Sequence, residues 1–465
     1  MSTPAEQVDV AVIGGGLAGM AAAAALAGSG FRVELLEARP YLGGRAASYE
    51  LPGNGGHIDN CQHVLLGCCT NLLDLYERMG ASRLIRFHDR IPFVTPGGRM
   101  SVIEAGRGRG GRAPAPLHLL GSLLRFHALS WRDKLSIAAG MTALAFEAGM
   151  RGRASLDRET MIEWLRGHAQ TRGAIEHFWR VVLTSALNED LERVSAWHGI
   201  QVFWKGFLAH RDAWRVGTPA APLSELYAAG PPGVGVRLRA RVRSLAGADT
   251  GAGGEPRRVV AACLGEGTAV AARWFVVALP FENLPELLPE CAPALEHSPI
   301  VGVHLWFDRP VLREPFAALL GRTIQWAFRR PGDDGYLQCV ISAARNLVSL
   351  SRNEIIDLAV RELHEFFPGA GAQLLRGTVV KELRATYSAA AGVDGARPAP
   401  ETSFENCFLA GDWVQCGWPA TMEGAVRSGY LAAERVAAAA GRPRRYLKPD
   451  LPPEGLSRWA PAARQ

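Results

Sequence analysis

The feature that most constrains the fold of this chain is a glycine-rich turn between an apolar run and an alanine-rich run. The pattern predicts a buried strand over Val8 to Ile13, a turn at Gly14-Gly15-Gly16-Leu17-Ala18-Gly19, and then a helix. Gly14 allows the tight turn, Gly16 lets the backbone approach a pyrophosphate, and Gly19 lets helix and strand pack closely. The sequence therefore predicts an α/β domain that holds phosphates at the positive N-terminus of the helix.

A second apolar run, Phe31 to Leu36, ends in Glu37, about 20 residues after the glycine turn, where a carboxylate accepts hydrogen bonds from an adenosine ribose. This carboxylate favours a free 2'-hydroxyl, which argues against NADP but does not separate NAD from FAD. The chain continues into a second glycine turn, Gly43-Gly44-Arg45, whose arginine can meet a phosphate or a carboxylate bidentately. A second glycine turn, at which the backbone can come close to a ligand, is expected for a longer, extended cofactor.

With Glu37 followed by Gly43-Gly44-Arg45, the sequence resembles the flavoprotein amine oxidase and carotenoid desaturase superfamily. The resemblance implies FAD and a discontinuous, Rossmann-like FAD-binding domain with a second α+β domain for the substrate. We also include Arg39 and Val242 in the expected cofactor site. The expected FAD-binding domain comprises residues 1–90, 215–290 and 400–440; the expected substrate domain comprises residues 91–214 and 291–399, and residues 441–465 form an irregular tail.

A second ligand-binding turn is predicted near the end of the chain. The run Cys407 to Leu409 delivers Gly411-Asp412 at the end of a strand, and a loop leads into a helix through about Ala440. Asp412 is placed to accept hydrogen bonds from ribityl hydroxyls. The amides from Thr421 and Met422 onward open the helix, and its positive end can face the flavin N1 and O2. In the alternative interpretation Asp412 caps a turn and Thr421 caps the helix.

The middle of the chain predicts a helical region and two groups of strands. We expect helices from about Trp131 to Phe207. Val234 to Leu245 alternates apolar and charged residues, which predicts one half-buried strand, with Arg257 to Leu264 as its hairpin partner. Trp274 to Pro280 is expected to return to the cofactor sheet. The elements expected in the second domain are strands at Val301–Phe307, Gln338–Ser342 and Leu374–Leu383 and a helix at Glu354–Phe367.

Composition limits the functional classes. With 465 residues, 48% of them hydrophobic, the chain is long enough for two domains with sizeable cores. The net charge of +6 includes few compact blocks of Lys and Arg, so we expect mild attraction to anionic membranes rather than nucleic-acid binding. The eight cysteines show no C-x-x-C pair and no metal spacing, and no signal peptide is evident, so a reducing cytoplasm is expected.

One segment has two interpretations. From Leu117 to Phe146, leucines and an apolar run alternate with the cations Arg125, Arg132 and Lys134, but no stretch offers about 18 uninterrupted apolar residues. The segment can lie on a bilayer with its basic side chains at the headgroups, which gives a peripheral position on the inner face of the cell membrane. Alternatively, it forms two core helices of the substrate domain.

Four longer strings narrow the family. They resemble the squalene-associated flavoproteins, whose members are described as hydroxysqualene dehydroxylases, and the resemblance runs from about Val8 to Ala437. One departure is Cys61, which stands where the family pattern has glycine. The strings are Asp59-Asn60-Cys61-Gln62-His63 through Gly67, Pro219 to Ser224, His304 to Asp308, and Gly411 to Trp413 with Trp418 to Gly429.

This resemblance implies a reductive reaction in squalene and hopanoid biosynthesis, in which hydroxysqualene, a long apolar isoprenoid, loses water and gains hydride from reduced FAD. The leaving hydroxide needs an acid. We name His63 first and Asp59 second, because their segment follows the Gly-Gly-Arg turn and returns near the isoalloxazine, with Glu423 third. In the other interpretation Asp59 and His63 only hydrogen-bond loop backbone and Glu423 caps a helix. Both interpretations stay open.

Two other functions are compatible with the sequence. Within the same fold, FAD can accept hydride instead, as in an oxidative polyene desaturase or an amine oxidase. The fold also occurs in non-catalytic prenyl-binding proteins, although the intact Gly14, Gly16, Gly19, Glu37 and Asp412 argue against that class. The sequence shows no second dinucleotide turn, so NAD(P)H binding transiently or a separate reductase is expected to supply electrons.

Overall fold

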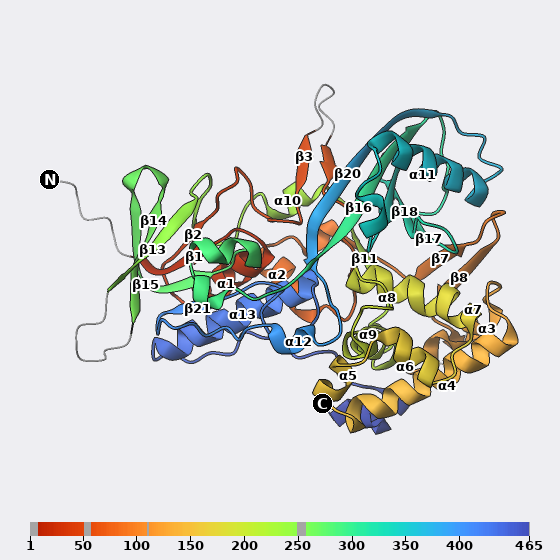
Figure 1. Ribbon diagram of the computed structural model, residues 1–465, viewed down its shortest axis with the longest axis horizontal. Coiled ribbons are helices and arrows are strands. Elements are labelled where there is room, and N and C mark those ends of the chain that lie inside the picture. Colours follow the sequence, from red (N-terminus) through yellow and green to blue (C-terminus); the bar gives the residue numbers. More distant parts are fainter. Residues whose placement is uncertain (1–7, 51–56, 109–110, 249–256, 465) are drawn as a thin grey trace.

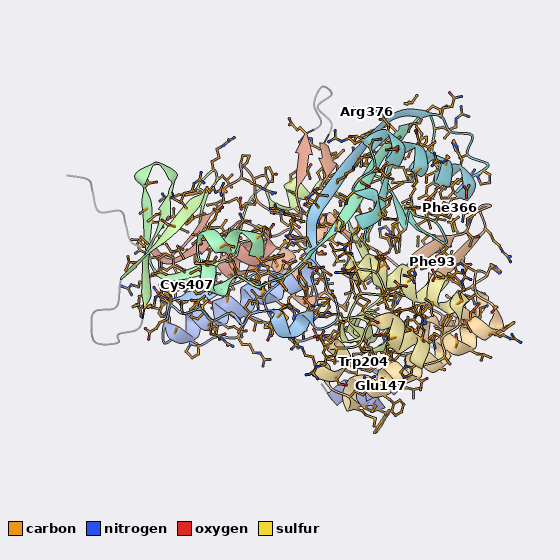
Figure 2. The ribbon with its side chains drawn as sticks, viewed as in Figure 1. Phe93, Glu147, Trp204, Phe366, Arg376 and Cys407 are labelled. Carbon is orange, nitrogen blue, oxygen red and sulfur yellow. The ribbon has the colours of Figure 1, made fainter. Side chains whose placement is uncertain are left out.

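Two large β-sheets and a helical region make up the protein. Figure 1 shows the computed structural model, with the first sheet at one end and the second sheet and the helical region at the other. The structure describes residues 8–50, 57–108, 111–248 and 257–464. One core cluster contains Phe93, Trp204 and Cys407, so buried side chains connect the two halves (Figure 2).

The centre of the first sheet is parallel. Its strands are buried on both faces, which explains why β1 is a continuous apolar run. Two further strands, β14 (Arg258–Leu264) and β13 (Val242–Ala248), extend the sheet from β15 as an antiparallel hairpin. In spatial order, the parallel strands are β12 (Val234–Arg237), β2 (Val33–Leu36), β1 (Val8–Ile13), β15 (Ala269–Val277) and β21 (Cys407–Leu409).

Three helices cover one face of this sheet: α1 (Leu17–Ala27), α2 (Thr70–Arg78) and α13 (Met422–Ala439). Every residue of α1 from Leu17 to Leu26 is buried, which explains why this helix is made mostly of alanine. α1 and α13 approach so closely that a Cβ on Gly429 would lie 2.1 Å from the carbonyl oxygen of Ala18. The alanine and glycine content of the two helices therefore fixes their packing.

The prediction of one strand from Val234 to Leu245 is wrong. The structure has two strands, β12 and β13, separated by Arg239 in the left-handed region at φ 57°. β12 is the edge strand beside β2, and the side chains of Val236 and Leu238 are exposed. The alternating pattern thus reflects an exposed edge rather than a half-buried strand, whereas the hairpin partner β14 and the return strand β15 are confirmed.

The second sheet has seven strands and contains all three strands expected in this part of the chain. Its long strand β16 alternates strictly: Val301, Val303 and Leu305 pack with α11 (Arg352–Phe366), which covers one face. Gly302 and His304 therefore lie on the opposite face. In spatial order, the strands are β20 (Leu374–Tyr387), β16 (His297–Phe307), β19 (Asp333–Ile341), β18 (Trp326–Arg330), β17 (Phe316–Leu319), β7 (Arg90–Val94) and β8 (Met100–Glu104).

The expected helical region between Trp131 and Phe207 is confirmed. It lies beside the face of the second sheet that α11 leaves free, because Trp326 Nε1 donates to Ser185 Oγ at 2.7 Å. Within the described ranges, no helix is long and apolar enough to cross a membrane. The helices are α3 (Leu120–Arg125), α4 (Trp131–Met150), α5 (Arg153–Asp157), α6 (Met161–Gly167), α7 (Arg172–Ala174), the π-helix η3 (Ile175–Trp179), α8 (Arg180–Leu187), α9 (Ala196–Phe203) and the π-helix η4 (Trp204–Leu208).

Smaller elements connect these layers. They are the hairpin β3 (Ser48–Glu50) and β4 (His57–Asp59), the three-stranded sheet of β5 (Leu65–Leu66), β11 (Val216–Pro219) and β6 (Ile85–His88), the hairpin β9 (Arg107–Gly108) and β10 (Gly111–Arg112), and the short helices α10 (Leu223–Tyr227) and α12 (Val393–Ala396). The chain after Arg444 is irregular, with two 3-10 turns, η9 (Gly455–Trp459) and η10 (Pro461–Arg464).

Candidate functional site

The candidate site lies where the parallel strands of the first sheet end. Gly14 follows β1, Glu37 follows β2, Ala278 follows β15, and Gly411-Asp412 follows β21. Because neighbouring strands are parallel, these four strand ends meet at one edge of the sheet. Ligands of open α/β sheets bind outside the carboxyl ends of the strands. The two glycine motifs and Asp412, far apart in sequence, are thus brought to one edge.

The glycines of the first turn are required for different structural reasons. Gly14 has φ 110°, and a Cβ there would lie 2.4 Å from the carbonyl oxygen of Ala278. A Cβ on Gly19 would lie 1.8 Å from the carbonyl oxygen of Gly14. Gly16 is different, since the nearest atom to its Cβ position is Gly44 Cα at 3.9 Å. The backbone at Gly16 is therefore bare at the start of α1, as a site for a closely approaching pyrophosphate requires.

The second glycine turn lies directly against the first. The Gly43 amide donates to the Gly15 carbonyl at 2.9 Å, and a Cβ on Gly44, which has φ 61°, would lie 3.0 Å from Gly16 Cα. Only residues without a side chain allow this approach. The two turns that the sequence predicted therefore form one continuous cradle of backbone, which fits an extended dinucleotide.

Glu37 is buried between these turns. Its Oε2 accepts from the Gly15 amide at 2.6 Å, and its Oε1 accepts from the Arg39 amide at 2.7 Å. Each carboxylate oxygen keeps a second lone pair for a ribose hydroxyl. The Ala240 amide donates to the Glu37 carbonyl at 2.8 Å, which brings the start of β13 at Val242 beside the predicted ribose site. Arg39, Val242 and Glu37 therefore lie close together.

Arg45 forms an ion pair with Asp412 and also donates from Nη1 to the Ala385 carbonyl at 2.8 Å. Of the two partners that the sequence allowed for Arg45, a phosphate or a carboxylate, the structure shows the carboxylate. Asp412 is 5% exposed, so it is held by the cation at the junction of the two glycine turns and β21. Its free carboxylate oxygen is the group that the predicted ribityl contact needs.

The first turn of α13 has both an N-cap side chain and amides at the positive end of the helix dipole. Thr421 Oγ1 accepts from the Gly424 amide at 3.0 Å and is the N-cap, as the alternative interpretation had it. This cap satisfies one of the orphan amides of the first turn and leaves the Met422 amide at the positive end of an 18-residue helix. The role of these amides toward a flavin stays a prediction.

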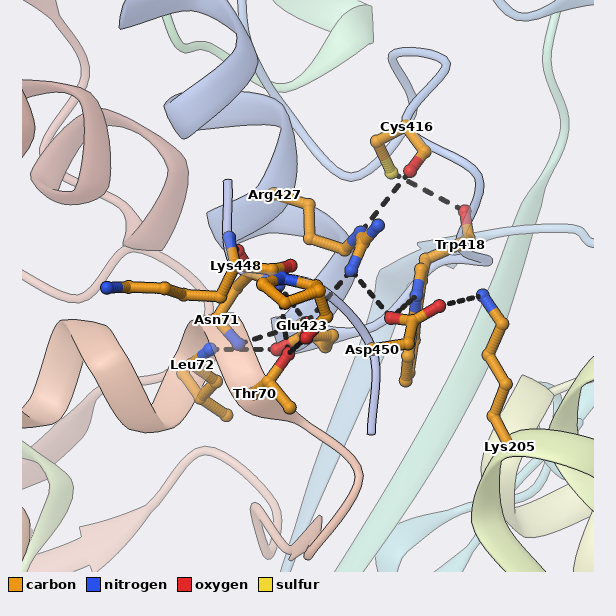
Figure 3. A network of polar contacts seen from close by, with 12 residues as sticks. Thr70, Asn71, Leu72, Lys205, Cys416, Trp418, Glu423, Arg427, Lys448 and Asp450 are labelled. Atoms are coloured by element: carbon orange, nitrogen blue, oxygen red, sulfur yellow. Dashed lines mark hydrogen bonds and ion pairs between the residues drawn. The ribbon is translucent and has the colours of Figure 1, made fainter. Parts of the chain in front are cut away.

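Glu423 makes the helix-capping contacts of the alternative interpretation. It is fully buried, and it accepts hydrogen bonds from the Asn71 amide at 3.2 Å, from Asn71 Nδ2 at 2.8 Å and from the Leu72 amide at 2.8 Å. These amides belong to the first turn of α2, so Glu423 caps a neighbouring helix rather than its own (Figure 3). Burial raises the pKa of the Glu423 carboxyl above its usual value, although the Leu72 amide and Arg427 Nη1, 3.6 Å away, oppose this shift.

Asp59 and His63 make the backbone contacts of the alternative interpretation. Asp59 Oδ1 accepts from Ser48 Oγ at 2.6 Å and from the Leu223 amide at 3.2 Å, at the start of α10. His63 Nδ1 lies 3.1 Å from the Cys61 carbonyl oxygen. Burial lowers the pKa of His63. Among the described residues its Nε2 has no hydrogen-bond partner, so this atom remains available to a ligand.

Sequence reasoning gave no role to His304. It is completely buried on β16, and its Nδ1 lies 2.6 Å from the Tyr336 hydroxyl. A Cβ on Gly302 would lie 3.6 Å from His304 Nε2 and 3.5 Å from Cys61 Sγ. The His304 face of the second sheet therefore meets the segment that carries His63. The signal available in the sequence was a single histidine inside the apolar run Val301 to Phe307.

Cys61 itself is in the left-handed region, at φ 72°, where the family pattern has glycine. Burial, together with the charge of Glu382, raises the pKa of its thiol to about 12, so the thiol stays protonated. The departure from the pattern thus places a buried, neutral thiol beside β16.

Comparisons with known proteins show which family the chain belongs to. The sequence profile of a family described as flavin containing amine oxidoreductase matches residues 17–437. A probable zeta-carotene desaturase of Synechococcus elongatus is 28% identical, over 91% of this chain and 98% of that protein. A 15-cis-phytoene desaturase of Solanum lycopersicum is 26% identical, over 93% of this chain and 78% of that protein.

Solved structures share the fold. An oxidoreductase from Methanosarcina mazei has a TM-score of 0.66 at 16% identity and covers 90% of this chain and 98% of its own. Cyclohexylamine oxidase from Brevibacterium oxydans has a TM-score of 0.62 at 18% identity and covers 94% and 100%. The predicted Rossmann-like fold with a second domain is confirmed, and the cofactor is FAD. The chain belongs to the family of flavin-containing amine oxidoreductases.

Proposed function

We propose that this protein is an FAD-dependent hydroxysqualene dehydroxylase, which replaces the hydroxyl of a C30 allylic-type alcohol by hydrogen. The C–O bond breaks, the hydroxyl leaves as water after taking up a proton, and carbon gains a hydride. Bound FAD supplies that hydride in its reduced form. The alternative reactions of this family run in the opposite redox direction.

The observation that carries the proposal is that the strings resembling the squalene-associated flavoproteins meet in space. Asp59, in the first string, accepts from the Leu223 amide in the second. Cys61, also in the first, lies beside β16, which contains the third. Asp412, in the fourth, pairs with Arg45, whose carbonyl oxygen accepts from Asn60 Nδ2 in the first at 3.2 Å. Segments separated by up to 367 residues thus surround one site, and the resemblance is concentrated there.

The residues of this site have distinct tasks in the proposed reaction. The glycine cradle and Glu37 bind the ADP half of the cofactor, and the Arg45–Asp412 pair binds beside its ribityl chain. The proton of His63 Nδ1 is donated to the Cys61 carbonyl, which leaves Nε2 to take up a proton and give it to the departing hydroxyl. Because burial lowers the pKa of His63, its protonated ring is a stronger acid than a free imidazolium. The proposed reaction also needs a site from which water is excluded, because water would recapture a carbocation.

The test is anaerobic turnover. Purified holoenzyme is incubated with hydroxysqualene and reduced FAD, and squalene is measured by gas chromatography. We expect stoichiometric squalene, and its absence would overturn the proposal. Gly16→Ala serves as a matched control that keeps the fold and loses cofactor. His63→Gln is expected to lower kcat by about 10²-fold with little change in KM, as the loss of a positioned proton donor predicts.

A second candidate is an oxidative desaturase of a carotenoid-type polyene. It is favoured by the curated relatives, because the zeta-carotene and 15-cis-phytoene desaturases match over nine-tenths of this chain at 26–28% identity. Incubation of the oxidised holoenzyme with phytoene or zeta-carotene, with absorbance spectra of the extracted pigments, distinguishes the two. New long-wavelength carotenoid bands without squalene formation would replace the first proposal by the second.

A further inference from the structure

Two buried side chains on the second sheet have unused hydrogen-bonding atoms. His304 Nε2 and Gln338 Nε2 are shielded from solvent and have no partner among the described residues. Buried polar groups are nearly always hydrogen-bonded, so two unpaired nitrogens at one place call for a ligand. We infer that His304 and Gln338 form the binding site for the single oxygen of a long apolar alcohol. This inference rests on the proposed function and names where its substrate is held.

The two residues are direct neighbours. His304 on β16 and Gln338 on β19 are opposite each other in the antiparallel register. Side chains at such positions have Cβ atoms about 4.5–5.5 Å apart on the same face of the sheet. That face is the one opposite α11, and α8 lies over it through the Trp326–Ser185 hydrogen bond. The two nitrogens therefore lie together between the sheet and the helical region.

The neighbouring groups orient His304 as a donor. The Arg330 guanidinium lies over the face of the Tyr336 ring, 3.8 Å from its centre. In the proposed site the Tyr336 hydroxyl, 2.6 Å from His304 Nδ1, is the donor of their hydrogen bond. Burial, reinforced by Arg330, lowers the pKa of His304 to about 3, which leaves a neutral ring with its proton on Nε2. Both Nε2 atoms of the pair thus carry N–H groups.

The surroundings select a mostly apolar ligand. In the sheet, Phe328 lies opposite Gln338 on the other side, and Val340 and Trp326 follow in the next row. Two N–H donors beside these apolar side chains recognise one oxygen atom of a mostly apolar ligand, and the nearby Arg330 cation disfavours a ligand with positive charge. Gly302 leaves His304 Nε2 in reach of the Cys61 segment, so the oxygen is held next to the loop that carries His63.

The test compares an alcohol with its hydrocarbon. Binding of hydroxysqualene and of squalene to the oxidised holoenzyme is measured from the change in flavin absorbance. We expect the wild type to bind the alcohol about tenfold more tightly, which corresponds to one net hydrogen bond. Gln338→Met and His304→Asn should lose this preference without weakening squalene binding. The shorter side chain of His304→Asn can still hydrogen-bond to Tyr336 but has no N–H group at the position of Nε2. The longer side chain of His304→Gln places an N–H group near that position, so this variant should keep the preference for the alcohol.

Each outcome of this binding experiment either supports or overturns the inference. Equal loss for both ligands, or no loss of preference, would overturn the inference, because it would mean a packing role. Phe328→Leu, in the same row of the sheet, is the matched control and should change both affinities alike. Squalene formation by a wild type that shows no alcohol preference would refute this inference alone. Failure of turnover with the preference intact would refute the dehydroxylase proposal and leave the oxygen site standing.

A second, independent observation concerns the surface of α4. Trp131, Leu135, Phe146 and Met150 are 51–74% exposed and recur every four or eleven residues, so they lie along one face of the helix. η10 packs against the same helix, and the preceding turn η9 exposes Trp459 by 83%. Figure 1 shows α4 and the C-terminal turn together at one end of the molecule. These five exposed residues are called the apolar strip.

Cations surround this apolar strip. Lys134 Nζ lies 5.0 Å from the Trp131 ring and donates to the Leu124 carbonyl at 2.7 Å. The side chains of Arg125, Arg132 and Arg458 are exposed. An apolar helix face bordered by cations is complementary to an anionic bilayer, in which the rings and aliphatic chains enter the interface and the cations meet headgroups. We propose that this surface docks on anionic lipid.

The test is cosedimentation of the holoenzyme with vesicles. Vesicles that contain phosphatidylglycerol, an anionic lipid, are compared with vesicles of pure phosphatidylcholine. Leu135→Glu and Trp459→Glu should each reduce binding at least tenfold. Leu375→Glu is the matched control, since Leu375 on β20 is exposed to the same 69% as Leu135. Equal losses in Leu135→Glu and Leu375→Glu would overturn the proposal, as would a lipid-free dimer that Leu135→Glu dissociates.

Discussion

The clearest prediction separates the two glycines at the start of α1. In Gly19→Ala the new Cβ would lie 1.8 Å from the Gly14 carbonyl oxygen, so α1 must move by about 1.2 Å to reach even the 3.0 Å that real Cβ atoms keep. Overpacking of this kind against backbone costs about 3 kcal/mol or more. We expect Gly19→Ala to destabilise the apoprotein itself and to lose FAD.

Gly16→Ala should behave differently. Its Cβ meets only Gly44 Cα, at an ordinary 3.9 Å, and φ of −75° suits any residue. The free energy of unfolding of the apoprotein should change by less than about 1 kcal/mol, since a weaker N-cap is offset by a stiffer unfolded chain. Bound pyrophosphate would lose at least one charge-assisted hydrogen bond to the helix start. The loss of about 3 kcal/mol lowers FAD affinity about 100-fold.

Two measurements check this pair. Urea unfolding of the apoproteins, followed by tryptophan fluorescence, gives the free energies, and titration with FAD gives the dissociation constants. The reasoning is refuted if Gly16→Ala binds FAD within threefold of the wild type. It is equally refuted if Gly16→Ala destabilises the apoprotein as much as Gly19→Ala does, because the bare backbone at Gly16 would then serve the fold alone.

Three further predictions concern buried ionisable side chains. Glu423→Gln turns an amide group toward the N–H donors of α2 and should cost about 3 kcal/mol in urea unfolding; a loss below 1 kcal/mol would contradict the capping role. Asp412→Asn should weaken FAD binding at least tenfold in the same titration, because Arg45 loses its carboxylate partner; unchanged affinity would exclude a cofactor role for the pair. Burial lowers the pKa of His198 to about 4. The unfolded chain binds its proton near pH 6.5 and the folded protein does not, so stability should fall by up to about 3 kcal/mol between pH 6.5 and 4. His198→Asn should flatten that part of the profile, and an unchanged slope would exclude His198 as its cause.

The predicted elements that the structure confirms are those whose signals are local. The strand, turn and helix from Val8 to Leu26 follow from hydrophobic periodicity and from backbone angles that only glycine adopts, both of which act within a few residues. Val234 to Leu245 shows the limit. Its alternation was correct, but alternation does not say whether the outer face meets solvent at the edge of a sheet.

The residues of the candidate site also fall into two groups: those that the sequence predicts and those whose partners only the structure shows. The glycines, Glu37 and Asp412 could be named from the sequence because a pyrophosphate and a ribose require those residue types at those spacings. By contrast, the choice of Asp412 as the partner of Arg45 and the capping of α2 by Glu423 join residues more than 350 positions apart. No local pattern encodes such pairs.

The sequence by itself determined the cofactor cradle, because phosphate binding depends on short-range backbone geometry that a few adjacent residues impose. Tertiary structure alone decided which polar side chains remain unpaired inside the protein. His304 and Gln338 become neighbours only through the register of β16 and β19, and only the packing around them leaves His304 Nε2 and Gln338 Nε2 without a partner among the described residues. Burial and pairing are properties of the whole fold, which is why the oxygen site was not visible in the order of the residues.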